Sequence, residues 1–213
     1  MTPDALLTVA VPKGRILAEA VALLRRAGID ARGALRDQRR LSIDLPGAGL
    51  RLLLLRPADV PTYVAHGAAD VGVAGSDVLE ESDADLYEPL DLGIGRCRMV
   101  VAEPSDGAAV ARDGHGQLRV VTKYPNVTRR WLEGKGIAAE VIRVAGSVEI
   151  GAIMGLADRI VDLVQTGGTL RANHLREVET IMDVSSRLVV NRAALKVRRA
   201  AVDRLLRRIA RVL

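Results

Sequence analysis

The 213-residue sequence has one cysteine, no phenylalanine and only 2% aromatic residues. Cys97 has no second cysteine to pair with, so the chain holds no disulfide framework and no cysteine metal site, which is typical of a reducing compartment. The scarcity of aromatic side chains argues against a surface that binds single strands of nucleic acid by base stacking. His66, His115 and His174 lie far apart and lack the spacing of metal ligands.

Long hydrophobic runs are also missing. The longest apolar stretches, such as residues 52–55, are far too short to span a bilayer, and residues 1–4 lack the basic and apolar regions of a signal peptide. We therefore expect a cytoplasmic protein. Because 49% of the residues are hydrophobic, the chain can bury a substantial core, and its length allows one large or two small domains.

Positive charge is concentrated at the C-terminal end. Residues 192–213 contain eight basic residues and one acid, Asp203, whereas the whole chain carries a formal charge of only +5, so the remainder is slightly acidic. Val202, Leu205 and Ile209 recur there at helical spacing. This pattern predicts an amphipathic helix whose apolar side packs on the core while its arginines face solvent. A partner subunit, nucleic acid or an anionic membrane are the alternative roles for the basic side.

Short apolar runs alternate with helix-like segments along the chain. We expect strands near residues 6–11, 50–55, 71–74, 96–102, 119–122, 139–144, 159–165 and 177–184, and helices near 16–27, 57–66 and 128–135. This alternation is typical of a mostly parallel α/β sheet. We predict two α/β domains, one formed by residues 1–95 with 185–213 and the other by residues 96–184. We expect the ligand in a cleft between them, near the carboxyl ends of strands.

Residues 159–170 carry the strongest functional signal. An apolar run with one acid, Asp162, leads directly into a Thr-Gly-Gly-Thr turn at residues 166–169. Glycines let backbone N–H groups approach an anion closely, and threonine hydroxyls can donate as well. The turn lacks the lysine of a Walker A loop and the spacing of a Rossmann loop. We interpret it as a phosphate-binding turn, with an ordinary glycine turn as the alternative.

Asp162 adds a second element to this turn. It lies four residues before Thr166, so we expect both in one crevice. A carboxylate can accept hydrogen bonds from sugar hydroxyls, which a bare phosphate does not have. The pattern therefore favours a phosphorylated sugar as the ligand.

The same region resembles the signature of the ATP phosphoribosyltransferase family. The matching positions are Glu149, Gly155, Ala157, Ile160, Asp162, Leu163, Thr166, Gly167, Thr169 and Leu170. Residues 11–15, 70–75, 92–98 and 122–130 also resemble that family, so the resemblance covers nearly the whole chain. It implies transfer of the 5-phosphoribosyl group from phosphoribosyl pyrophosphate to N1 of ATP with release of pyrophosphate, the first step of histidine biosynthesis. The implied fold is two α/β domains with a cleft, like type II periplasmic binding proteins.

The resemblance is to the short form of the family, whose catalytic subunit lacks the regulatory domain of the long form. It implies a homodimer, and a hetero-octamer with a regulatory subunit similar to a histidyl-tRNA synthetase. It also implies Mg²⁺ at the substrate phosphates. No general base is needed, because adenine N1 already has a lone pair.

Roles for individual residues follow from the same resemblance. The residues expected to bind the 5-phosphate are Thr166, Gly167, Gly168, Thr169 and Leu170. The ribose hydroxyls would be held by Glu149 and Asp162. The catalytic arginines would be Arg56 and Arg39, with Arg40 as the alternative to Arg39. Arg56 follows an expected strand, where a guanidinium could clamp the leaving pyrophosphate, or it could be an ordinary surface residue.

A further set is expected to bind ATP or pyrophosphate. Its members are Lys13, Arg15, Asp70, Gly75 and Arg96. The basic residues whose role stays open between substrate phosphates and subunit contacts are Lys123, Arg129 and Arg130.

Two other functions remain open. The chain could be a non-catalytic small-molecule-binding protein of the same fold, since fold does not fix function. The lack of an export signal and the phosphate turn argue against this. It could also bind nucleic acid through the basic C-terminal helix, but the acidic body and the few aromatic residues argue against that.

Overall fold

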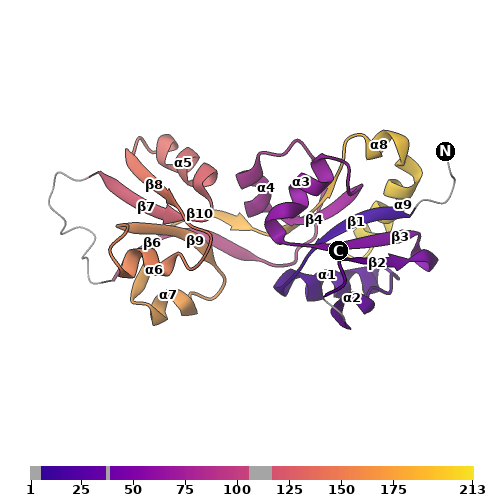
Figure 1. Ribbon diagram of the computed structural model, residues 1–213, viewed down its shortest axis with the longest axis horizontal. Helices are drawn as coiled ribbons and strands as arrows, with labels where there is room; N and C mark the ends of the chain where they lie inside the picture. The colour runs from indigo at the N-terminus through magenta and orange to yellow at the C-terminus, as the bar shows by residue number, and fades with distance from the viewer. Residues whose placement is uncertain (1–5, 37–38, 106–116) are drawn as a thin grey trace. The chain divides into compact units, whose positions relative to one another are not determined.

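The computed structural model describes residues 6–36, 39–105 and 117–213. The chain divides into two compact units: the part up to Gly95 together with Ser185–Leu213, and Arg96–Val184. Each unit is built on one mixed sheet with helices on both faces (Figure 1). His115 and residues 1–4, considered above, lie outside the described residues.

The first unit contains a six-stranded sheet. Its strands, in spatial order, are β2 (Ser42–Leu45), β3 (Leu50–Leu55), β1 (Leu7–Pro12), β4 (Val71–Gly75), β11 (Ser186–Val190) and β5 (Tyr87–Asp91). Strands β3, β1 and β4 run parallel, as expected for buried and almost wholly apolar segments, while β2, β11 and β5 are antiparallel to their neighbours. The carboxyl ends of β3, β1 and β4 therefore meet at one edge.

Helices cover both faces of this sheet. They are α1 (Arg15–Arg26), α2 (Gly33–Arg36), α3 (Val60–Ala65), α4 (Ser76–Ser82), α8 (Ala194–Val197) and α9 (Arg199–Ala210), with the short 3-10 turns η1 (Pro46–Ala48) and η2 (Pro57–Asp59). Helices α1, α2 and α9 pack into the larger core, and α3 and α4 into the smaller core on the other face. Gly28, with φ of 74°, follows α1 in a left-handed conformation typical of a helix end.

The C-terminal helix α9 closes the larger core. Val202, Leu205 and Ile209 are all buried there. Arg208 donates from Nε to the carbonyl oxygen of Ala27 at 3.1 Å, and its Nη2 donates to the next carbonyl at 2.8 Å. These carbonyls directly follow α1, so the arginine ties α9 to the segment that ends α1. The predicted packing of the apolar side on the core is confirmed.

The second unit contains a five-stranded sheet. Its strands, in spatial order, are β10 (Leu175–Val184), β6 (Cys97–Pro104), β9 (Arg159–Val164), β7 (Leu118–Thr122) and β8 (Ala139–Arg143). Strands β9, β7 and β8 are parallel, and β6 and β10 are antiparallel to their neighbours. Helix α5 (Pro125–Gly134) packs on one face, and α6 (Glu149–Ile153) and α7 (Gly168–Ala172) on the other (Figure 1).

The expectation of mostly parallel sheets is wrong, because both sheets are mixed. Strands β2, β5 and β11, which the sequence pattern did not reveal, add antiparallel pairs to the first unit. In the second unit β6 and β10 were expected as strands, but their direction depends on pairing between distant segments. Among the described residues, no helix is long and apolar enough to cross a membrane.

The packing of α9 gives a first prediction. Ile209→Ala should lower the free energy of unfolding by about 2–4 kcal/mol, because it removes a fully buried side chain and leaves a cavity. Val197, which is 71% exposed, supplies the control. Val197→Ala should change the free energy of unfolding by less than about 0.5 kcal/mol. Urea unfolding of both variants tests this, and equal effects would contradict the packing.

Candidate functional site

The Thr-Gly-Gly-Thr turn connects β9 to α7. Gly167 is buried and has a left-handed backbone, with φ of 73°, and Gly168 is the first residue of the helix. Glycine adopts this conformation without the steric penalty that other residues meet. The first N–H groups of a helix have no partner within the helix, so they can serve an anion. The predicted passage from a strand into the turn is confirmed, and a short helix follows.

Side chains of α7 hold the turn in place. Arg171 donates from Nη2 to the carbonyl oxygen of Thr166 at 3.1 Å, and Asn173 donates from Nδ2 to the carbonyl oxygen of Thr169 at 2.9 Å. Leu170 is buried in the core beneath the helix, whereas both threonines are exposed. The turn is therefore anchored on one side and open to solvent at its hydroxyls.

Asp162 lies on β9 just before this turn. Its side chain is 14% exposed and forms an ion pair with Lys123, with Nζ and Oδ2 separated by 3.4 Å. The N–H of Leu163 donates to its other carboxylate oxygen at 2.8 Å. Strands β7 and β9 are parallel with Thr122 opposite Val161, so the next residues of the two strands lie side by side. The pairing of the sheet thus brings the lysine to the acid.

The environment of Asp162 shifts its protonation. Burial raises the pKa of the Asp162 carboxyl above its usual value. The Leu163 N–H and the Lys123 ammonium oppose this rise, while the negative charge of Glu149, the first residue of α6, adds to it. The structure therefore brings together the two carboxylates that were assigned to one sugar, and it adds a cation that balances part of their charge.

Lys123 is the residue of this group whose role the sequence left open. Its position directly after an apolar strand was the available signal, but only the pairing of β7 with β9 reveals its partner. Thr122 fixes the segment, because its hydroxyl donates to the carbonyl oxygen of Val161 at 2.8 Å and accepts from the N–H of Tyr124 at 2.9 Å. The other two open candidates, Arg129 and Arg130, are exposed on α5, which packs on the opposite face of the sheet.

In the first unit, the backbones of Lys13 and Arg56 lie near each other at the carboxyl edge of the sheet. The N–H of Lys13 donates to the carbonyl oxygen of Leu55 at 2.8 Å. Lys13 therefore lies beside Leu55, the residue that precedes Arg56. Arg56 is exposed, and Pro57 starts η2 directly after it. Arg15 is the exposed first residue of α1, and Gly75 ends β4 at the same edge.

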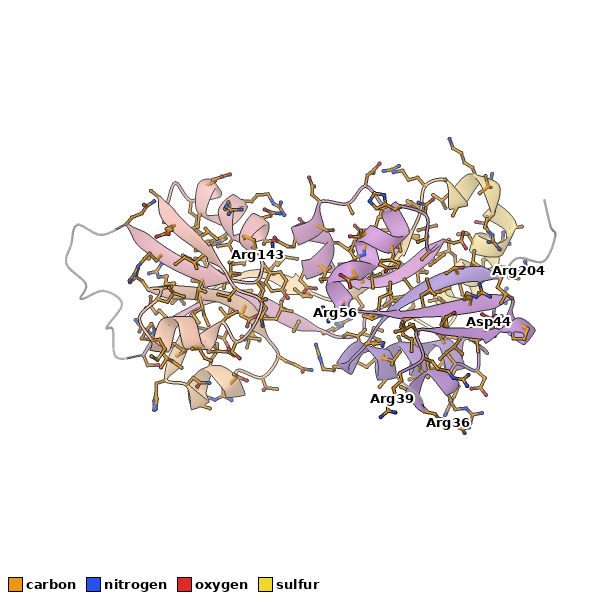
Figure 2. All side chains as sticks on the ribbon, in the orientation of Figure 1. Arg36, Arg39, Asp44, Arg56, Arg143 and Arg204 are labelled. Carbon is orange, nitrogen blue, oxygen red and sulfur yellow. The ribbon has the colours of Figure 1, made fainter. Side chains whose placement is uncertain are left out.

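Arg39 approaches this edge from another element. The N–H of Leu54 donates to the carbonyl oxygen of Leu41 at 2.9 Å, so the chain enters β2 beside the carboxyl end of β3. The backbones of Arg39 and Arg40 thus lie at the edge where Arg56 lies. In Figure 2 the side chains of Arg39 and Arg56 do not meet. The choice between Arg39 and Arg40 stays open.

Asp70 is not brought to the other candidates. It precedes β4 and therefore lies at the amino end of the strand, opposite the edge of Arg56. Its carboxylate accepts from the N–H of Thr8 at 2.8 Å and from Nη1 of Arg198 at 3.4 Å, which links β1 to the segment before α9. Asp70 is part of the scaffold of this unit, because both of these contacts are structural.

Asp77 was missed by the sequence reasoning. It lies in the first turn of α4 and is only 5% exposed, and a Cβ atom added to Gly75 would collide with its carboxylate. The signal was an acid two residues after an apolar strand.

Arg96, the remaining candidate, is exposed and belongs to the second unit. Over the described ranges, no group of three or more His, Cys, Asp or Glu residues could hold a metal ion.

Comparison with known proteins reveals close relatives. The family model for ATP phosphoribosyltransferase matches residues 56–211. The chain is 51% identical to an ATP phosphoribosyltransferase of Acidithiobacillus ferrooxidans over 208 residues, covering 95% of both chains, and 45% identical to one of Citrifermentans bemidjiense over 205 residues, covering 96% of both.

Two solved structures are also similar. One is the ATP phosphoribosyl transferase (HisG:HisZ) complex of Thermotoga maritima, with a TM-score of 0.81, 36% identity and 97% of each chain covered. The other is the alkanesulfonate-binding protein of Xanthomonas axonopodis pv. citri, with a TM-score of 0.56 and 14% identity, covering all of this chain and 74% of the other. The second likeness concerns the fold alone. The predicted fold of the type II periplasmic-binding-protein kind is confirmed.

The environment of Asp162 predicts an unusual pH dependence of stability. A carboxyl whose pKa is raised by folding stabilises the folded chain most below its unfolded pKa of about 3.8, and this contribution is lost as the pH rises through the folded pKa. Asp162→Asn should therefore leave the melting temperature unchanged or raised at pH 7, with a gain that grows between pH 4 and the raised pKa and then levels off. Thermal unfolding from pH 4 to pH 8 measures this.

Asp44 supplies a control of opposite sign. It is bound by Nε and Nη2 of Arg51 at 2.6 and 2.9 Å, and this hydrogen bonding lowers its pKa. Its contribution to stability is present above the unfolded pKa and is lost as the pH falls. Asp44→Asn should therefore not raise the melting temperature at pH 7. A fall for Asp162→Asn at neutral pH that matches that of Asp44→Asn would contradict the account.

Proposed function

The chain belongs to the ATP phosphoribosyltransferase family, and we propose how its residues carry out that reaction. The reaction transfers the 5-phosphoribosyl group from phosphoribosyl pyrophosphate to N1 of ATP, releases pyrophosphate and begins histidine biosynthesis. The chain spans 95% of the length of its relative from A. ferrooxidans.

The second unit binds the phosphoribosyl group in this proposal. The turn at residues 166–170 receives the 5-phosphate through its backbone N–H groups and the two threonine hydroxyls. Asp162 and Glu149 accept hydrogen bonds from the ribose hydroxyls, and Lys123 offsets the charge that these carboxylates would otherwise place beside a phosphate. The observation that carries the proposal is that a partly buried acid, paired to a lysine, lies on the strand that leads into an open Thr-Gly-Gly-Thr turn.

The first unit supplies cations for the leaving group. As the bond at C1 breaks, positive charge develops on the ribose and negative charge on the departing pyrophosphate. Arg56 would bind the pyrophosphate oxygens with its planar guanidinium. Lys13, beside it, and Arg15, with Arg39 or Arg40, would bind phosphates of pyrophosphate or ATP. Adenine N1 attacks with its own lone pair, so positioning and electrostatic stabilisation account for catalysis.

Mg²⁺ belongs to the proposal as a companion of the substrate phosphates. This ion is commonly held by one or two carboxylates together with phosphates rather than by a cage of side chains. The substrate phosphates would be its main ligands, and no side chain of the chain is assigned to it. When bound, the ion neutralises charge on the leaving pyrophosphate.

Assembly with a second protein is also part of the proposal. The similar structure from T. maritima is a HisG:HisZ complex. We propose that this chain likewise joins a second, regulatory subunit, and that it does so as a homodimer within a hetero-octamer, as the family resemblance implies. Inhibition by histidine would then depend on that subunit. The cytoplasm is the proposed location, where the substrates ATP and phosphoribosyl pyrophosphate would be available.

One assay tests the reaction directly. Purified chain is mixed with ATP, phosphoribosyl pyrophosphate and Mg²⁺, with and without the regulatory subunit, and the ultraviolet absorbance change on substitution of adenine N1 is followed. A signal that needs both substrates is expected. Silence in both conditions with folded protein would favour a non-catalytic binding protein.

Arg56→Ala should lower the single-turnover rate by about 100-fold, because it removes a cation from the charge that develops on the leaving group. Arg51→Ala is the matched control, since Arg51 lies on β3, the strand that Arg56 follows, and pairs with Asp44 away from the carboxyl edge. Rapid-quench measurement of product formation compares the two. An unchanged rate in Arg56→Ala would exclude the leaving-group role.

A further inference from the structure

We propose that Arg171 and Glu177 are positioning residues that orient the Thr166–Gly167 peptide toward the 5-phosphate. The inference rests on the proposed function, since it concerns the turn assigned to that phosphate. Neither side chain needs to contact substrate. Both act on the back of the turn.

Arg171 holds the carbonyl of this peptide. Its Nη2 donates to the carbonyl oxygen of Thr166 at 3.1 Å. In a trans peptide the C=O and the following N–H point in opposite directions. Because the guanidinium holds the Thr166 oxygen on one side, the N–H of Gly167 points to the other. This orientation presents a donor to an anion and keeps a carbonyl oxygen, which would repel the anion, away from it.

Glu177 lies beside Arg171 at the same point of the turn. A Cβ atom added to Gly167 would be 2.9 Å from Nη1 of Arg171 and 3.3 Å from Oε1 of Glu177. Opposite charges thus flank the glycine from α7 and from β10. Glycine is required at position 167 for two reasons: a larger side chain would collide with these two charged groups, and the backbone has a left-handed φ.

The remaining oxygen of Glu177 is tied to the sheet. Its Oε2 accepts from Nη2 of Arg98 at 2.7 Å, which connects β10 to β6. The carboxylate is therefore held by an arginine of the sheet, while its other oxygen lies near the space beside Gly167 that Arg171 also borders. The pair of Arg98 with Glu177 is 41% and 34% exposed, so its loss should disturb stability little.

The test compares inhibition by ribose 5-phosphate with inhibition by pyrophosphate, using the full chain with its regulatory subunit. Ribose 5-phosphate carries the phosphate that the turn would bind, whereas pyrophosphate does not. In Arg171→Gln and Glu177→Gln, ribose 5-phosphate should inhibit about five- to tenfold more weakly, as expected for one misdirected hydrogen bond. The KM for phosphoribosyl pyrophosphate should rise by a similar factor, while kcat and inhibition by pyrophosphate stay within about twofold.

Glu179→Gln is the matched control. Glu179 lies on the same strand and loses the same charge, but its partner is Lys135 of the α5 side, with Nζ and Oε1 at 2.6 Å. For this variant, inhibition by ribose 5-phosphate and by pyrophosphate, the KM for phosphoribosyl pyrophosphate and kcat should all stay within about twofold of the wild type. If Glu177→Gln and Arg171→Gln behave like this control while Asp162→Asn weakens ribose 5-phosphate, the positioning role is overturned and the proposed site stands.

Two more outcomes complete the test. If Asp162→Asn also leaves ribose 5-phosphate inhibition unchanged, the phosphoribosyl site itself is misplaced, and the positioning role falls with it. A fall in kcat with unchanged KM in Arg171→Gln would contradict an effect on ground-state binding of the phosphate. Melting temperatures identify unfolded variants, and should Arg171→Gln not fold, Glu177→Gln alone decides.

Discussion

The parallel pairing of β7 with β9 is the constraint on which the candidate site depends. With Thr122 opposite Val161, the residue that follows β7, Lys123, lies beside Asp162 of β9, before the Thr-Gly-Gly-Thr turn. A slip of one residue would turn Asp162 to the opposite face, because successive side chains alternate across a sheet. It would then point toward α5 rather than toward α6 and α7. The core residues Ile160 and Val164 fix the register, since both must remain buried on the face that α6 and α7 cover.

This placement has an energetic consequence. Burial raises the pKa of Asp162, so the ionised carboxylate is held in a setting that disfavours it. The Lys123 ammonium and one backbone N–H offset only part of the effect. A residue that weakens the fold in this way is expected where binding gains from it, because a partly dehydrated carboxylate forms stronger hydrogen bonds with a sugar than with water. The scaffold contributes stability elsewhere, as in the packing of α9 on the larger core.

The sequence predicted the parts of the fold that have a local signal. The apolar run of β3 and the glycine turn after β9 were both found because composition and spacing reveal them. Strand β5 was missed, since its Pro89 and its exposed residues match no buried pattern. The partner of Lys123 and the structural role of Asp70 depend on which strands are neighbours. Pairing between segments distant in sequence cannot be read from either segment alone.

The most direct measurement of the central claim is a double-mutant cycle on Lys123 and Asp162, read as the Kd for phosphoribosyl pyrophosphate. Lys123→Met, Asp162→Asn and the double variant are compared with the wild type by calorimetry. If the pair acts as one unit on the ribose, the double variant should lose less affinity than the sum of the single losses, by about 1 kcal/mol. Strictly additive losses, or no loss in Asp162→Asn, would contradict the account.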